Sequence, residues 1–434
     1  MPASRPLAAL AAAVLLSLAG LGAPAARAAD KTHVVWWDFL SGGDGVRMKA
    51  MIAKFNAESP DIQIDATTLE WGTPFYTKVQ TSAAVGQGPD VMTYHISRLP
   101  LGVSTGTLRP FTDRDLAAVG LGADDYFRTD WDAAHIDGRL YGVPLDIHSV
   151  ILYYNKDLLA RAGLLDDRGL PKGLDGIANF DAALKKLTGG GTEYGLSFAS
   201  GDNSGGTNWR IFYTLLAQMD GSFIRDGKVL PGDNATKAVR ATETIANWVK
   251  QGWAPKNTDY PASIALFTSG KAAMHINGVW EVPTMVDLAA SHKLGFAWGA
   301  VQIPTLFAHP ATWADSHSFA IPARSGNPVP AEKVAAVMKV IAWMNRNSIM
   351  WAAAGHIPAY RPVTESAAFR DMQPNATYST LAQTAVFDPR SKIAGVASPV
   401  YEACTNFIQP AINGQLPAAD AIGQLREELQ ADLQ

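Results

Sequence analysis

The alternation of apolar and polar positions is most regular just after residue 142, where the chain is predicted to be extended. Residues two apart on a strand face the same side. Asp146 and His148 would therefore project together, while Leu145 and Ile147 pack into the body of the protein. A long apolar run follows and ends in a turn and a helix-forming segment, which is typical of a buried strand entering a new αβ unit. We expect the chain to pass from one lobe to another here.

The first part of the chain alternates between strand-like and helix-like segments. Short apolar runs at 33–39, 62–67 and 91–95 predict strands. Between the first two, apolar residues recur at the spacing of one helix face, for example at Met48 and Phe55. Such an alternation with short turns predicts a mostly parallel sheet covered by helices on both faces.

Ligands of such sheets bind at the carboxyl ends of the strands. By this rule Trp37, Asp38 and His95 lie at the edge of a cleft. Because neighbouring strand residues point to opposite faces, we expect Trp36 to be buried and Trp37 to be exposed.

The second part of the chain also alternates, and it returns to the first lobe. A helix is predicted over 180–187, and a loop opens another helix after Trp209. The segment 313–322 reads as a second passage between lobes, and an amphipathic helix over 331–345 would pack on the first lobe. A third passage at 355–361 and a helical tail would complete the second lobe.

Composition fits a globular protein of two domains. The chain has 434 residues, of which 47% are hydrophobic and 18% are charged. The net charge of −4 provides no basic face, so we expect neither nucleic acid nor anionic lipid as a partner. The single cysteine, Cys404, excludes an intramolecular disulfide and a cysteine metal cluster.

The N-terminus has the features of an export signal. Residues 1–28 combine an early Arg5, an apolar run and an Ala-Arg-Ala sequence before Ala29, which predicts a cleaved signal peptide. An uncleaved membrane anchor is the alternative. No cysteine stands at the end of the signal, so we expect no lipid anchor there and a soluble, periplasmic protein. We also expect it to be a monomer.

Several motifs, taken in order, resemble the family 1 extracellular solute-binding proteins, which are sugar receptors of ABC importers. Gly142-Val143-Pro144, followed by Leu-Tyr-Tyr-Asn-Lys-Asp-Leu-Leu at 152–159, resembles the first passage between lobes in that family. The segment 267–274, Phe-Thr-Ser-Gly-Lys-Ala-Ala-Met, resembles a family strand, and Gly278-Val279-Trp280 resembles a turn whose Trp commonly stacks on sugar. The resemblance covers nearly all of the chain after the signal peptide.

The resemblance implies a two-lobe, type II periplasmic-binding-protein fold of the α/β class. Each lobe would be a mostly parallel sheet flanked by helices, and a hinge of three crossings would join them. The N-terminal lobe would comprise 29–147 and 318–356, and the C-terminal lobe 148–317 and 357–434. The implied function is capture of a mono- or disaccharide and its delivery to a permease and an ATPase, without enzymatic activity, cofactor or metal.

The candidate ligand-binding residues combine aromatic and polar side chains, because aromatic rings cover the apolar faces of a sugar and polar groups bind its hydroxyls. For each of them the alternative is a place in the core or in a structural hydrogen bond. The candidates are Trp36, Trp37, Asp38, Trp71, His95, Asp146, His148, Asn208, Trp209, Asn277, Gly278, Trp280, Asp315 and Arg361.

The sequence fits other ligands and activities less well. A glycerophosphate-type ligand would favour a cluster of cations, and the candidate positions offer only Arg361. The Gly-x-Ser-x-Gly sequence at 102–106 matches a hydrolase motif, but prolines on both sides leave no room for the strand and helix that the motif needs. A glycoside hydrolase using Asp146 and Asp315 would depend on residues that move apart with the hinge. The histidines show no zinc-ligand spacing.

Overall fold

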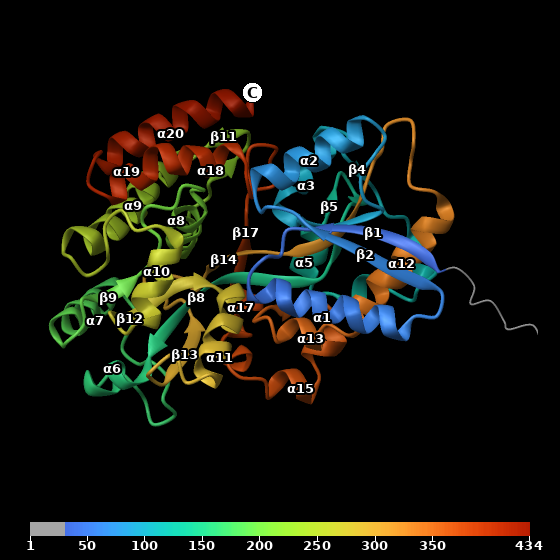
Figure 1. Cartoon of the computed structure of the whole chain (residues 1–434). Helices are drawn as coiled ribbons and strands as arrows, with labels where there is room; N and C mark the ends of the chain where they lie inside the picture. The colour runs from blue at the N-terminus through green and yellow to red at the C-terminus, as the bar shows by residue number, and fades with distance from the viewer. Residues whose placement is uncertain (1–30) are drawn as a thin grey trace, which may run out of the picture.

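The computed structural model describes residues 31–434 and contains two large sheets, seen side by side in Figure 1. The signal peptide predicted at 1–28 lies outside the described residues. The first sheet has the order β2-β1-β3-β15-β4, and β7 also pairs with β15. Its strands are β1 (Thr32–Asp38), β2 (Ile62–Thr68), β3 (Val91–His95), β4 (Leu108–Arg109), β7 (Val143–Pro144) and β15 (His317–Pro322).

The second sheet has the order β17-β14-β8-β12-β9, and β13 and β16 also pair with the long strand β8. β8 is buried along its whole length. Burial was predicted for its apolar part, whereas Asp146 and His148, expected to project from the strand, are buried as well. The strands are β8 (Asp146–Asn155), β9 (Tyr194–Ser197), β12 (Ala272–Gly278), β13 (Trp298–Gln302), β14 (Thr312–Asp315), β16 (Ile357–Pro358) and β17 (Ala385–Phe387).

Both sheets are mixed, which corrects the expectation that they are mostly parallel. β1 pairs in parallel with β2 and β3, but β15 is antiparallel to β3, β4 and β7. β8 is likewise antiparallel to β12, β13, β14 and β16. Parallel neighbours are usually joined by a helical crossover. β8 and β15 instead enter directly from the other sheet, so nothing requires them to run parallel to their new neighbours.

Helices flank the first sheet as the sequence predicted. α1 buries Met48, Met51, Ile52 and Phe55, the face identified from their spacing. Trp36 is buried and Trp37 is partly exposed, as the alternation along β1 predicted. The helices on this side are α1 (Gly43–Glu58), α2 (Thr73–Ala84), α3 (Leu99–Ser104), α4 (Asp113–Ala117), α5 (Arg128–Ala133), α12 (Ala331–Arg346) and α13 (Ile349–Ala352).

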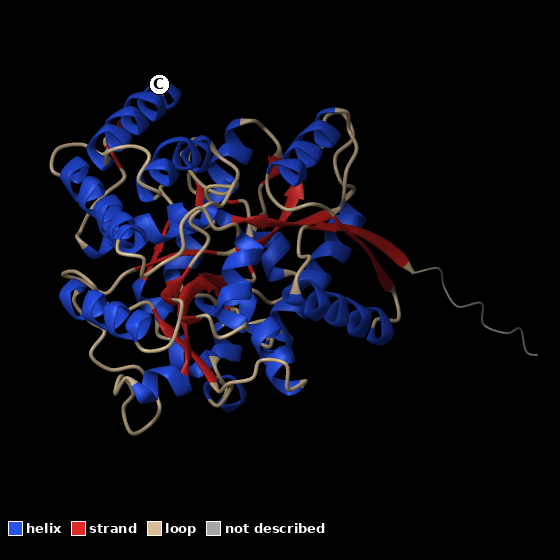
Figure 2. Cartoon of the chain, turned by 60° about the vertical axis from the view of Figure 1, so that its left-hand side comes forward, coloured by secondary structure: helices blue, strands red, loops and turns tan. Residues whose placement is uncertain are grey.

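The second sheet is covered by a larger set of helices (Figures 1 and 2). α8 packs against β14, α7 against β9 and α10 against β12, while the C-terminal α20 lies against α9. These helices are α6 (Lys156–Arg161), α7 (Ile177–Gly189), α8 (Gly206–Gln218), α9 (Asn234–Lys250), α10 (Tyr260–Thr268), α11 (Val282–Ala290), α18 (Pro399–Ala403), α19 (Gln409–Ile412) and α20 (Ala418–Leu433).

Short elements complete the chain. The helical turns α14 (Arg361–Thr364), α15 (Ala367–Arg370), α16 (Asn375–Tyr378) and α17 (Leu381–Thr384) follow β16. The 3-10 turns η1 (Ile96–Arg98) and η3 (Val279–Glu281) follow β3 and β12. The strand pairs β5 (His135–Ile136) with β6 (Arg139–Leu140) and β10 (Ile224–Arg225) with β11 (Lys228–Val229) form small hairpins.

The chain passes between the sheets at three places. It leaves β7 of the first sheet and enters β8 through Leu145. It returns from β14 to β15 through Ser316, and it enters β16 of the second sheet after α13. Within residues 31–434, no helix has both the length and the apolar character needed to cross a membrane.

Candidate functional site

A cavity of about 470 Å³ lies between residues of the two sheets. Its first side comes from the loop after β1, the start of α2 and the end of β3, and its second side comes from α8, α10 and the turn after β12. The lining residues are Phe39, Leu40, Ser41, Gly42, Gly43, Asp44, Trp71, His95, His148, Asp202, Ser204, Arg210, Tyr260, Trp280, Glu281, Thr284 and His317.

Two tryptophans give this cavity partly exposed aromatic surface, one from each side. Trp71 precedes α2, and its ring meets His95 edge-on at 6.4 Å between centroids. Trp280 lies in the turn after β12, and its indole Nε1 donates to the Tyr260 hydroxyl at 2.8 Å. That hydroxyl in turn donates to Asn277 Oδ1 at 3.1 Å. The ring of Trp280 is therefore held in place by its own hydrogen bond.

Arg210 is the cationic side chain of the cavity, and the sequence interpretation missed it. It is 7% exposed, and its guanidinium carbon lies 4.8 Å from the ring centroid of Trp280 and 4.7 Å from that of Trp313. The guanidinium thus stacks with two indole rings, a favourable arrangement for a cation. A signal was present in the sequence, because Arg210 is the one charged residue in the otherwise apolar run 209–213.

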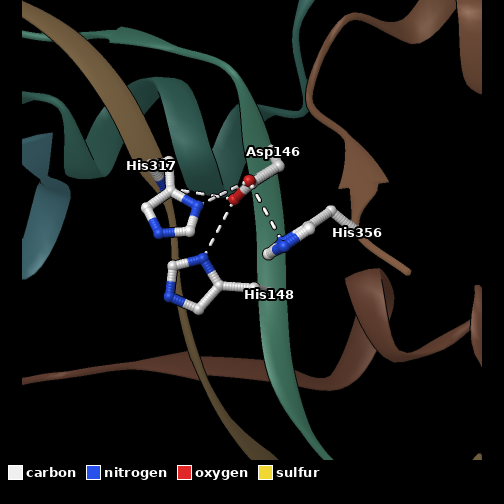
Figure 3. Close-up of side chains that lie close together, drawn as sticks. All are labelled: Asp146, His148, His317 and His356. Atoms are coloured by element: carbon white, nitrogen blue, oxygen red, sulfur yellow. Dashed lines mark hydrogen bonds and ion pairs between the residues drawn. The ribbon is translucent and has the colours of Figure 1, made fainter. Parts of the chain in front are cut away.

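A buried cluster around Asp146 joins the places where the chain passes between the sheets (Figure 3). Asp146 Oδ1 accepts from His148 Nδ1 and from the backbone N–H of His317, both at 3.0 Å. Oδ2 accepts from His317 Nδ1 at 2.8 Å and from Trp351 Nε1 at 2.6 Å. His356 Nδ1 lies 3.2 Å from the same oxygen. One carboxylate therefore contacts residues from all three passages.

The charges in this cluster follow from burial and proximity. Burial acts to raise the pKa of Asp146, but His317 and His356 outweigh it and hold the pKa well below its usual range. Burial acts to lower the pKa of His317, and the Asp146 carboxylate outweighs it, so that pKa is raised. Burial and the neighbouring His317 lower the pKa of His148. These directions favour an ionised Asp146 carboxylate paired with a protonated His317, and they favour the neutral form of His148.

The same cluster has side chains of the types that bind divalent metals. Ligand atoms of Asp146, His148, His317 and His356 lie within 4.8 Å of one another. Each Asp146 oxygen already accepts at least two N–H groups, however. The observed hydrogen bonds account for the arrangement of the carboxylate without an ion.

Three acidic residues also line the cavity. Burial raises the pKa of Asp44, and burial together with the nearby Asp44 raises that of Glu281. Asp202 is occupied locally, because its carboxylate accepts from the backbone N–H groups of Ser204 and Thr207, each at 2.9 Å. Asp44 Oδ1 accepts from the Gly45 backbone N–H at 2.7 Å, and Glu281 Oε2 accepts from the Tyr260 hydroxyl at 3.5 Å. Both carboxyl groups are thus partly engaged, but they line the cavity where ligand hydroxyls can reach them.

The structure brings four of the candidate residues together at the cavity: Trp71, His95, His148 and Trp280. His95 is fixed by a 2.6 Å hydrogen bond between its Nδ1 and the Tyr76 hydroxyl. Asp146 lies directly behind His148 and contacts it, without lining the cavity itself.

The other candidates lie away from the lining. Trp36 is in the core, and Trp37 is partly exposed with Lys78 near its ring. Trp209 is fully buried, and its Nε1 donates to Asp388 at 2.7 Å. Asp315 is also fully buried and accepts from the Ser97 backbone N–H and hydroxyl. Asp38, Asn208, Asn277 and Gly278 are buried outside the lining as well.

The cation that lines the cavity differs from the one expected from the sequence. Arg361, the only cation among the candidate positions, has a side chain 44% exposed on α14 and pairs with Glu365. Arg210 lines the cavity in its place. The cavity therefore contains a cation that an anionic ligand could bind.

Comparison with known proteins gives one family match. Residues 50–382 match the model of the bacterial extracellular solute-binding protein family. A galactooligosaccharide-binding protein of Bacillus subtilis is 26% identical over 314 residues, 68% of this chain and 66% of that protein. The maltodextrin-binding protein MdxE of the same organism is 30% identical over 244 residues, 51% of this chain and 49% of that protein. The matches thus span about half to two thirds of the length of these relatives.

Solved structures match over nearly the whole chain. The GacH receptor of Streptomyces glaucescens, determined without ligand and with acarbose, has a TM-score of 0.76 and 20% identity, covering 93% of this chain and 98% of that chain. The maltose/maltodextrin-binding domain MalE of Bdellovibrio bacteriovorus has a TM-score of 0.71 and 19% identity, covering 93% of this chain and all of that chain. These likenesses establish the two-lobe fold of periplasmic binding proteins.

Proposed function

The chain belongs to the bacterial extracellular solute-binding protein family, and we propose that its solute is a saccharide bound in the cavity between the two sheets. As a solute-binding protein the chain is not an enzyme. The hydrolase motif at 102–106 fits this, since Ser104 is the last residue of α3 rather than the turn between a strand and a helix.

The observation that carries the proposal is the pairing of aromatic and polar groups around one cavity. Trp71 and Trp280 present rings from opposite sides, and rings of this size suit the apolar faces of a sugar. His95, His148 and Asp44 add donors and acceptors for hydroxyl groups. The volume of about 470 Å³ falls within the range of about 300–1,000 Å³ that is usual for small-molecule sites.

The relatives support the same class of solute. The names of the two Bacillus subtilis relatives refer to galactooligosaccharides and maltodextrin, and the GacH receptor was crystallised with acarbose. We propose that this chain delivers a mono- or short oligosaccharide to the permease and ATPase of an ABC importer. Export to the periplasm and a monomeric state belong to the same proposal.

We further propose that the lobes close on the solute about the three passages. The N-terminal lobe would comprise 29–147 and 318–356, and the C-terminal lobe the remainder of the mature chain. The division is supported by the sheet order, because β8 and β14 pair in the second sheet while β7 and β15 pair in the first.

A thermal-shift screen of the purified protein against neutral and acidic saccharides tests the proposal. A ligand at a hundred times its dissociation constant stabilises the folded state by roughly 2.7 kcal/mol. Calorimetry on any hit then gives the affinity. If no saccharide of either kind shifts the melting temperature while glycerol 3-phosphate does, the saccharide assignment is wrong.

A further inference from the structure

We propose that the bound saccharide carries a carboxylate group, as a uronic acid does, and that Arg210 binds this group. The inference rests on the proposed saccharide function and assigns the charge of the solute. It starts from the location of one guanidinium group in the cavity.

Arg210 is held where its guanidinium faces the solute. It projects from α8, in which every residue from Gly206 to Leu216 is buried. Besides Trp280 and Trp313, the rings of Trp71 and Tyr401 lie 5.9 Å from its guanidinium carbon. Rings on several sides restrict the side chain to one place, so the cation does not have to be ordered when a ligand arrives.

This cation has no carboxylate partner of its own. Within residues 31–434, no acidic side chain lies within 4.0 Å ion-pairing distance of Arg210, and its buried Nε has no hydrogen-bond partner. Against the effect of burial, Tyr401 and Asp202 are close enough to raise its pKa. Asp202 accepts from the backbone N–H groups of Ser204 in its own loop and of Thr207 on α8. A buried charge without a partner is costly, and stacking on indole rings offsets only part of that cost. A ligand that supplies an anion would complete the site.

The remaining charges favour a carboxylate over a phosphate. A guanidinium presents two parallel N–H groups that match the two oxygens of a carboxylate. A phosphate dianion would meet only this arginine and the histidines, with Asp44, Asp202 and Glu281 in the same lining. A singly charged sugar matches one arginine, and its hydroxyl groups can donate to Asp44 and Glu281.

The test compares ligands that differ in one charge. Galacturonate and glucuronate, together with a digalacturonate, are titrated by calorimetry against their methyl esters and against galactose and glucose. Each ester keeps the shape of its acid and removes the charge. We expect at least one acid to bind roughly 10- to 100-fold more tightly than its ester, as a charge-assisted hydrogen bond would provide.

Variants then locate the effect. Arg210→Gln should remove most of the preference for acid over ester, so that the ratio of the two affinities falls towards one. Arg240→Gln is the matched control, because Arg240 is exposed and lies beside Phe307 outside the cavity lining. It changes the net charge equally and should leave the preference intact.

The outcomes separate this inference from the proposed function. If neutral saccharides or esters bind as tightly as the acids, the proposed function stands and the carboxylate inference is overturned. The inference also fails if Arg210→Gln weakens acid and ester equally, or if a sugar phosphate binds more tightly than every uronate. If no saccharide binds at all, the proposed function itself fails. If the Arg210 variant does not fold, the ratio of acid affinity to ester affinity in the unaltered protein still tests whether a carboxylate is preferred.

Discussion

Arg47 on α1 and Asp287 on α11 form a two-pronged ion pair, with Nη2–Oδ1 at 2.6 Å and Nη1–Oδ2 at 2.8 Å. α1 packs against β2 of the first sheet, and α11 follows β12 of the second sheet through η3. Each partner lies one helical turn beyond a residue that lines the cavity, Gly43 in one case and Thr284 in the other. The pair therefore joins the two sides of the structure beside the solute site.

Asp287→Asn should loosen the closed arrangement. Because the side chain of Asp287 is 60% exposed, the pair contributes only about 0.2–1 kcal/mol. We expect faster dissociation of the saccharide, by up to about fivefold, with little change in the melting temperature of the free protein. Stopped-flow dissociation at low and high salt measures this.

The charge-swapped double variant, Arg47→Asp with Asp287→Arg, should recover much of the slower dissociation. A lower melting temperature of the free protein with unchanged dissociation would mean that the pair stabilises the fold rather than closure.

Trp280→Ala should weaken saccharide binding by about 2 kcal/mol or more, as is typical of an aromatic residue at the centre of a binding site. The substitution removes a ring that lines the cavity and one of the rings stacked on Arg210. Trp37→Ala is the matched control, since Trp37 is also partly exposed but lies outside the lining. Calorimetry on both variants measures the two affinities. If Trp280→Ala weakens binding no more than Trp37→Ala does, Trp280 lies outside the binding surface.

Asp315→Ala should act on stability rather than on binding. The carboxylate accepts from the Ser97 backbone N–H at 3.0 Å and from the Ser97 hydroxyl at 2.5 Å, and it is fully buried. Its removal leaves buried donors without a partner, at a cost of roughly 1–3 kcal/mol. Urea unfolding of the free protein should show the loss, and the folded fraction should bind saccharide normally. Reduced affinity at unchanged stability would restore Asp315 as a ligand-binding residue.

Asp388→Asn should change how stability depends on pH. Burial, with a smaller effect from Asp315, raises the pKa of Asp388 to about 7 from an ordinary value of 3.8. Between about pH 4 and pH 7, the folded protein retains a proton on Asp388 that the unfolded chain releases. Asp388 therefore lowers the free energy of unfolding progressively as the pH rises through this range. Asparagine cannot ionise, and its Oδ1 can still accept from Trp209 and Trp313 as the aspartate does.

We expect the difference in melting temperature between Asp388→Asn and the unaltered protein to move in favour of the variant between pH 4.5 and pH 8. Calorimetric melting at both pH values measures this. A difference that stays constant across this range would show that the carboxyl group does not titrate there.

The sequence predicted the two-lobe fold and the passages from one segment to the next because both depend on local patterns and on motif order. It did not predict the mixed sheets, since strand direction depends on which sheet a returning segment joins. Alternation along a strand separated Trp36 from Trp37, but it could not tell whether the exposed ring faces the cavity. Trp209 and Arg210 illustrate the same limit on a helix: both are buried, and only the packing of α8 decides which one faces the solute.

The cluster around Asp146 has a consequence for the order of events during capture. The Asp146 carboxylate contacts all three connecting segments, so it lies at the hinge. Groups near a hinge move least when the two lobes rotate relative to each other. His148 and His317 would keep their positions in the open form, whereas Asp44 and Glu281 would approach each other only as the halves meet. In the open form, the solute would find His148 and His317 already in their binding positions, whereas Asp44 and Glu281 would reach theirs only on closure. Recognition would therefore begin at the histidines.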